Sequence, residues 1–209
     1  MPYSRIPNPV LPMRALLLLP FLAAAAQAQA PASAPIPPAA QQIAAAVLPL
    51  PAEMRAGATV MGYREAGKLV VLRQGTNGMH CLALYVTRPD FHVACYHESL
   101  EPFMARGREL RAQGVTGAQV DSVRFREVRE KKLAMPAMGA LYTITAKKEQ
   151  YDAAANKVNG TDGLLAVVYV PGATTATTGV PSQPRSNGPW LMFPGTLKAH
   201  IMMVGTMTP

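Results

Sequence analysis

Residues 58–73 read ATVMGYREAGKLVVLR, and this stretch decides the fold class. Its two apolar runs, 58–63 and 68–73, are typical of β-strands. The four residues between the runs end in Gly67, which can adopt the positive φ that a tight turn requires. The stretch therefore predicts an antiparallel β-hairpin at the start of the folded domain.

Similar strand patterns continue along the chain. A second turn signal, Gly75-Thr-Asn-Gly78, follows the hairpin, because Asn-Gly favours tight turns. The further strands are expected at 81–86, 91–96, 141–146, 164–170, 190–193 and 199–203.

Two helices are expected between the early and the late strands. Ser99 is a suitable N-cap for the first helix, and Gly114 suits its C-terminal end. Thr116 and Gln119 have the spacing of a capping box for a second helix, which extends to about Lys132. Strands, then helices, then strands predict an α+β fold: a single domain with a mixed or mainly antiparallel sheet and two central helices.

The first 28 residues have the composition of a secretory signal peptide. Arg5 and Arg14 are the only charges before the apolar stretch 15–26, which is too short for the ~20 residues of a membrane-spanning helix. An A-x-A pattern ends at Ala28, so cleavage is expected there, and the mature chain is expected to be exported, periplasmic or secreted, with no transmembrane segment.

The remainder divides into a linker and one domain. Residues 29–51 are rich in Pro and Ala and are expected to be a linker, with room for one or two helical turns at 41–48. Residues 52–205 are long enough for one hydrophobic core and are expected to form a single globular domain.

Charge and cysteine content restrict the function classes. The net charge is +8, but acidic residues lie between many of the basic ones, as on ordinary solvated helices. Nucleic acid is a poor partner for an exported protein, whereas anionic lipid head groups or cell-wall polymers remain open as partners. Cys81 and Cys95 are the only cysteines, so export predicts a disulfide between them.

Three blocks of sequence resemble a family of exported bacterial proteins of unknown function. The first combines ATV at 58–60 with GKLVVLRxGTNG at 67–78 and Cys81; the second is Met135-Pro136; the third is GPWLMxPGTxxAHIM at 188–202. The resemblance implies a single exported domain. It implies no activity, cofactor or catalytic residue.

Histidines near sulfur residues raise the alternative of a His/Met/Cys metal-binding protein. His80, His92 and His97 surround the two cysteines, and His200 precedes Met202 and Met203. These spacings match no zinc motif, and neighbouring strand residues such as 80 and 81 point to opposite faces. We therefore expect no metal site and no cofactor.

A small periplasmic hydrolase is the enzymatic alternative. His97, Glu98 and Ser99 are the residue types of a catalytic triad, but three adjacent residues cannot converge on one another. Neither Gly-x-Ser-x-Gly nor Ser-x-x-Lys occurs in the chain. Whether the protein is an enzyme is left open by the sequence, and Ser99 is better explained as a helix cap.

The long loop 171–189 is the best candidate for a functional surface, because long loops in compact domains are commonly functional or mobile. Arg185 offers a fork of donors to an anionic or polyhydroxyl ligand, and Trp190 offers a face for stacking. With His200 they form the predicted ligand-binding site; the alternative is that Trp190 belongs to the core and His200 is a satisfied strand residue. The sequence thus favours a non-catalytic exported protein that binds a small molecule or an envelope component.

Overall fold

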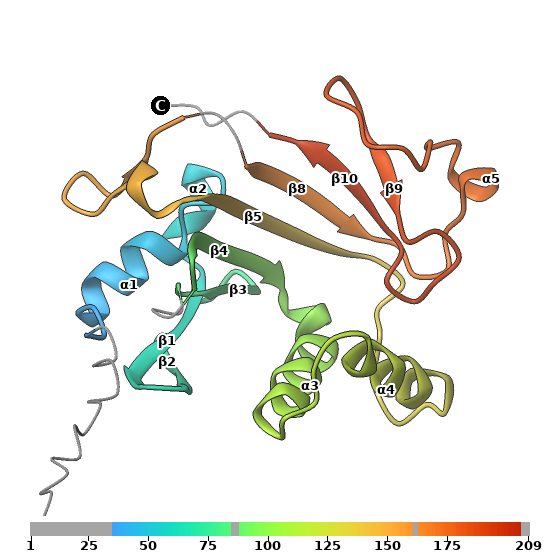
Figure 1. Ribbon diagram of the computed structural model, residues 1–209, viewed down its shortest axis with the longest axis horizontal. Helices are drawn as coiled ribbons and strands as arrows, with labels where there is room; N and C mark the ends of the chain where they lie inside the picture. Colours follow the sequence, from blue (N-terminus) through green and yellow to red (C-terminus); the bar gives the residue numbers. More distant parts are fainter. Residues whose placement is uncertain (1–34, 85–87, 161–162, 206–209) are drawn as a thin grey trace, which may run out of the picture. The chain divides into compact units, whose positions relative to one another are not determined.

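The computed structural model describes residues 35–84, 88–160 and 163–205 (Figure 1). The predicted signal peptide lies outside these residues. Within them, the helices are all too short or too polar to cross a membrane.

Eight strands form the main sheet, in the order β2-β1-β3-β4-β5-β8-β10-β9. Their bounds are β1 Thr59–Glu65, β2 Lys68–Arg73, β3 Met79–Leu82, β4 Asp90–His97, β5 Gly139–Lys147, β8 Leu164–Tyr169, β9 Trp190–Met192 and β10 His200–Val204. The pair β1–β3 is parallel and the other pairs of this sheet are antiparallel. A separate small ladder pairs β6 (Tyr151–Asp152) with β7 (Lys157–Val158).

Five α-helices accompany the sheet in the described residues. They are α1 Ala39–Ala46, α2 Ala52–Arg55, α3 Glu101–Ala112, α4 Ala118–Arg129 and α5 Thr175–Thr178. Short 3₁₀ turns, η1 (Glu98–Leu100) and η2 (Lys148–Gln150), follow β4 and β5. The α+β class, the mixed and mainly antiparallel sheet and the two central helices, α3 and α4, are confirmed.

The first hairpin forms where the sequence predicts it. Glu65 pairs with Lys68 at the end of β1 and β2, and Gly67 takes a φ of 77° in the turn between them. Only glycine adopts this left-handed conformation without a steric penalty, which is why the chain reverses at this point.

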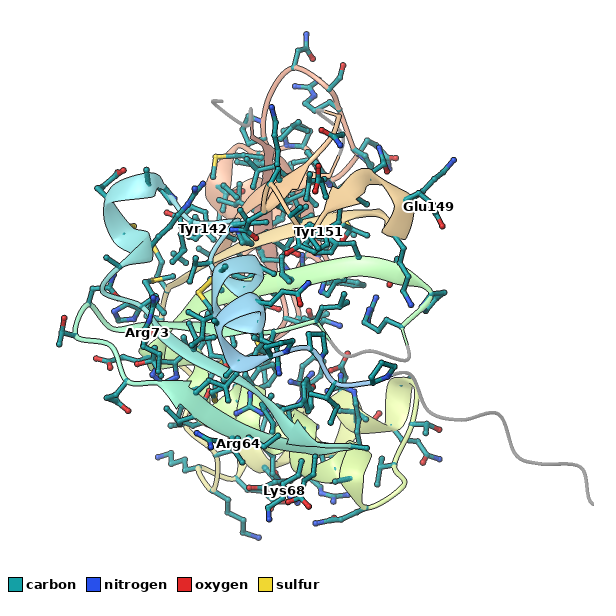
Figure 2. The ribbon with its side chains drawn as sticks, turned by 90° about the vertical axis from the view of Figure 1, so that its left-hand side faces the viewer. Arg64, Lys68, Arg73, Tyr142, Glu149 and Tyr151 are labelled. Carbon is teal, nitrogen blue, oxygen red and sulfur yellow. A yellow bond between two sulfur atoms is a disulfide. The ribbon has the colours of Figure 1, made fainter. Side chains whose placement is uncertain are left out.

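The interval 29–51 differs from the expected linker in its second half. From Ala39 it forms α1, and the end of this helix and the segment after it are packed into the core, with Ala46 and Leu50 almost fully buried. The Gln42 side-chain amide accepts a hydrogen bond from the Tyr63 backbone N–H and donates one to its carbonyl, which ties α1 to β1. The alanine-rich composition that suggested a linker instead lets a helix lie close against the sheet (Figure 2).

The two faces of the sheet carry different helices. Cys81 and Cys95 belong to the apolar cluster that includes Ala46 and Leu50, so α1 covers this face. Their strand neighbours Leu82 and Tyr96 belong to a different cluster, which includes Leu100 and Met104 around α3. Successive strand residues point to opposite faces, so we call these the α1 face and the α3 face.

Helices α3 and α4 lie side by side (Figure 1). Arg106 on α3 donates to both carboxylate oxygens of Glu127 on α4, at 2.9 and 2.7 Å. The start of α4 differs from the predicted capping box: Gly117, with a φ of 57°, is the N-cap, and no side chain caps the helix. Ser99 likewise lies inside η1, where its backbone N–H is capped by the His97 ring.

The predicted disulfide is present. Cys81 on β3 and Cys95 on β4 are direct partners across the antiparallel pair, with a Cα–Cα distance of 4.0 Å. Both residues are fully buried beneath α1. The bond therefore links two inner strands of the sheet within the buried core.

Removal of this bond is expected to destabilise the domain by about 3 kcal/mol, because the unfolded chain regains the freedom of a closed loop of about 15 residues. The double variant Cys81→Ala/Cys95→Ala, compared with the oxidised protein by urea denaturation, measures the loss. Reductant should lower the midpoint of the oxidised protein and leave that of the variant unchanged. Equal midpoints for the wild type and the variant without reductant would show that the disulfide does not stabilise the fold.

Candidate functional site

The α3 face carries an apolar surface that the helices leave partly open. Its cluster has four buried members, Tyr96, Leu100, Val167 and Tyr169. Around them lie seven partly buried apolar residues: Met61, Leu82, Met104, Met135, Leu141, Leu165 and Met202. In the other two clusters the buried residues outnumber the partly buried ones. We call these seven residues the open apolar surface.

The opening follows from the width of the sheet. Eight strands at a spacing of about 4.8 Å span roughly 34 Å, whereas one helix with its side chains is about 10 Å wide. On the α3 face, η1 and α3 supply Leu100 and Met104 to the cluster, and α4 reaches the C-terminal strands through Asp121 and Lys198. The apolar side chains between these contacts remain only partly buried.

Strand register places three residues of the open apolar surface in one row, together with Ala94 and Thr143. Met61 pairs with Leu82, Leu82 with Ala94, Ala94 with Thr143, and Thr143 with Leu165. Each of these residues is only half-buried, and the row runs across five neighbouring strands. Methionine is prominent around it, and its flexible thioether adapts to varied ligand shapes.

A polar cluster borders this surface at β3, β4 and α3. Tyr96 donates a hydrogen bond to Glu101 at 2.5 Å, and Arg108 donates to both the Tyr96 hydroxyl and the Glu101 carboxylate, at 2.8 and 2.5 Å. Burial raises the pKa of Tyr96 well above its usual value, so its hydroxyl stays protonated. His80 Nδ1 lies 3.6 Å from the same carboxylate and has no hydrogen-bond partner in the described part of the chain.

A second polar cluster joins α4 to the C-terminal strands. The Asp121 carboxylate accepts hydrogen bonds from Arg124, three residues further along α4, and from Lys198 Nζ at 3.0 Å. Burial alone would raise the pKa of Asp121, but these two bonds hold it below the usual value. The Arg124 guanidinium lies 3.9 Å above the Phe103 ring and donates to the Phe103 carbonyl.

His200 lies beside this second cluster, at the start of β10. Its Nδ1 is 2.7 Å from the Lys198 carbonyl oxygen, so Nδ1 carries the proton and Nε2 is left as an acceptor. Its ring centroid is 5.1 Å from that of Tyr169 and 5.7 Å from that of Phe193. Burial lowers the pKa of His200, which keeps the imidazole neutral near pH 7.

The structure brings together two of the three predicted ligand-binding residues. Trp190 pairs with Met202 and His200 with Met192, so Trp190 and His200 occupy diagonal positions on the same face of β9 and β10. Both are only 7% exposed, and the Trp190 indole N–H has no partner among the described residues. Arg185 is exposed in the loop before β9. The described structure shows no contact between Arg185 and either Trp190 or His200.

The geometry of the described residues gives little support to the metal-binding and hydrolase alternatives. Both cysteine sulfurs are joined in the disulfide and cannot bind a metal as thiolates. Among the described residues no three His, Cys, Asp or Glu side chains are grouped for metal binding. His97 Nδ1 lies 2.9 Å from Ser99 Oγ, but it also accepts the Ser99 backbone N–H, which is the arrangement of a local cap.

Sequence reasoning missed most of the polar residues on this face. Arg124 lies one turn after the buried Val120, so its position in the apolar stripe of α4 was a readable signal of burial. Glu101 and Arg108 are seven residues apart, a spacing that places both on one side of a helix. Nothing local could have paired Lys198 with Asp121, because these residues are 77 positions apart in the chain.

Comparison with family models, with curated proteins and with solved structures returned no match. The resemblance to exported bacterial proteins of unknown function thus remains a prediction from the sequence, and the functional argument depends on the geometry of the described residues.

The buried neutral His200 predicts a loss of stability in mild acid. Because its pKa is lower in the folded state than in the unfolded chain, the unfolded chain binds the proton more readily. The contribution of His200 to the free energy of unfolding is complete above pH ~6.5. It decreases as the pH falls below that value, by at most about 1.4 kcal/mol per pH unit. His92, whose pKa burial also lowers, adds a decrease of the same sign.

The variant His200→Asn keeps a donor toward the Lys198 carbonyl and removes the titration. Urea denaturation between pH 7.5 and pH 5 should show a smaller pH dependence than in the wild type. The exposed, non-ionisable Gln113 supplies the control, since Gln113→Asn should keep the wild-type slope. An unchanged slope in His200→Asn would show that His200 is not held neutral by burial.

Proposed function

We propose that the protein is an exported, non-catalytic binding domain that takes up an apolar or amphipathic molecule of the cell envelope on its α3 face. The observation that carries this proposal is the open apolar surface, in which partly exposed side chains outnumber the buried ones. Contiguous apolar surface that folding leaves in contact with water commonly marks a binding site.

The composition of the face supports a small molecule as the occupant. Ligand sites are commonly mostly apolar with a few polar groups at fixed positions, and here two polar clusters adjoin the apolar cluster, the one at Glu101 through Tyr96 and the one at Asp121 beside Tyr169 and His200. A second copy of the chain is a less suitable occupant, because each mature copy, without Arg5 and Arg14, has a net charge of +6 (+8 minus 2) and the two would repel each other.

Export forms part of the proposal. The disulfide is the kind of bond that forms and persists in an oxidising compartment. The composition of the first 28 residues supports the same location, and an envelope molecule is the apolar ligand that an exported domain would meet.

A neutral apolar fluorophore, N-phenyl-1-naphthylamine, tests the proposal on the mature protein. We expect saturable binding with a rise in fluorescence, and displacement by dodecanol. Leu165→Glu and Met202→Glu place a charge on the open apolar surface and should weaken binding at least tenfold, because an ionised carboxylate must be desolvated beneath the ligand.

Met138→Glu is the matched control, because Met138 is 65% exposed and does not belong to the open apolar surface. Circular dichroism and the melting temperature establish that each variant is folded. Absence of saturable binding by the wild type, or equal binding by all variants, would contradict the proposal. A wild-type dimer that Leu165→Glu converts to a monomer, measured by sedimentation, would assign the face to a second copy instead.

A further inference from the structure

The cluster between α4 and β10 contains more positive than negative charge. Arg124 and Lys198 share the single carboxylate of Asp121, one on each of its oxygens. In the part of the chain that the structure describes, neither cation has a second carboxylate partner. His200 beside them is neutral, so the cluster has a surplus of one positive charge.

Arg124 makes this surplus costly, because its side chain is only 5% exposed. Two of its nitrogens donate, one to the Phe103 carbonyl and one to Asp121. The third, Nε, is buried and has no partner in the described structure. A guanidinium cannot lose its proton at physiological pH, and the Phe103 ring stabilises its charge but offers Nε no acceptor, so an added anionic acceptor would satisfy the unpaired N–H and offset the charge.

The cluster adjoins the open apolar surface. His200 and Met202 are two residues apart on β10 and share the α3 face, and His200 pairs with Tyr169, a member of the same apolar cluster. The hydrogen bond from His200 to the Lys198 carbonyl fixes the backbone from which the Lys198 side chain extends. A ligand lying on the apolar residues would therefore end close to Lys198 and Arg124.

We infer that this cluster binds the anionic head, a carboxylate or a phosphate, of an amphipathic ligand whose chain lies on the open apolar surface. This inference rests on the proposed function. Lys198 and Arg124 supply donors, and an anionic oxygen is the acceptor that neutralises the surplus charge. A neutral hydroxyl would satisfy a donor but leave the charge, and a cationic head would add to it.

Three ligands with the same chain length and different head groups distinguish the effect of the head group on affinity from that of the chain: dodecanol, dodecanoate and dodecyl phosphate. Each is titrated into the mature protein, and displacement of N-phenyl-1-naphthylamine gives its affinity. Trp190 is the only tryptophan, so its emission gives an independent signal at the C-terminal strands. We expect both anionic ligands to bind about tenfold more tightly than dodecanol, with a preference that salt reduces.

Two variants change the charge of the cluster in opposite directions. Lys198→Gln removes the more accessible cation and should weaken binding of the anionic ligands about tenfold, leaving dodecanol unchanged. Asp121→Asn removes the competing carboxylate and should strengthen binding of the same two ligands. Lys132→Gln is the charge-matched control, because this lysine is largely exposed and pairs with Glu130, and it should change neither affinity.

The outcomes separate this inference from the proposed function. Equal affinities for the three ligands, or equal losses in Lys198→Gln and Lys132→Gln, would overturn the anionic head group while binding of dodecanol upholds the apolar site. Failure of all three ligands to displace the fluorophore would overturn both. A preference for only one of the two anions identifies the head group as a carboxylate or a phosphate.

Discussion

The eight-stranded sheet is wider than the helices that pack against it, and the rest of the structure depends on this mismatch. Eight strands form a sheet with two faces about 34 Å across. The helices that the described residues form cover only part of each face. The strands nevertheless carry apolar residues on both faces, one set packed beneath α1 and the other around Leu100 and Met104. The uncovered side chains on the α3 face are the direct consequence, and the proposed ligand replaces the missing layer.

The two faces of the sheet have different roles: the α1 face stabilises the fold, and the α3 face carries the proposed binding site. On the α1 face, the disulfide and the apolar segment after α1 form a closely packed core, with Cys81, Cys95 and Ala46 fully buried. A rigid core on one side lets the opposite side keep partly exposed residues without loss of the fold. The Arg106–Glu127 pair joins α3 to α4 at the surface, and so holds Arg124 of α4 against Phe103 of α3.

The fold was largely predictable because its signals are local. The first hairpin, the α+β class and the disulfide follow from turn residues, strand patterns and a lone pair of cysteines, and all three are present. The position of α1 in the core was not predictable, since its alanines gain an apolar partner only once the sheet exists. Composition alone cannot distinguish such a helix from a linker.

The candidate site was predictable only in part, for the same reason. Trp190 and His200 lie together on one face because both occupy short strands that the sequence already indicated. Their polar surroundings come from α4 and from the loop before β10, and pairing between segments so distant in the chain leaves no local pattern. Arg185 was chosen for its chemistry alone, and its loop keeps it exposed.

The central claim is that the ligand covers the α3 face, and oxidation footprinting of the methionines tests it most directly. Met202 and Met203 are neighbours on β10, both half-buried, but they point to opposite faces of the sheet. Mass spectrometry after brief exposure to hydrogen peroxide gives their oxidation rates with and without dodecyl phosphate. Our account predicts slower oxidation of Met202 with ligand and an unchanged rate for Met203; protection of Met203 alone, or of neither residue, would contradict it.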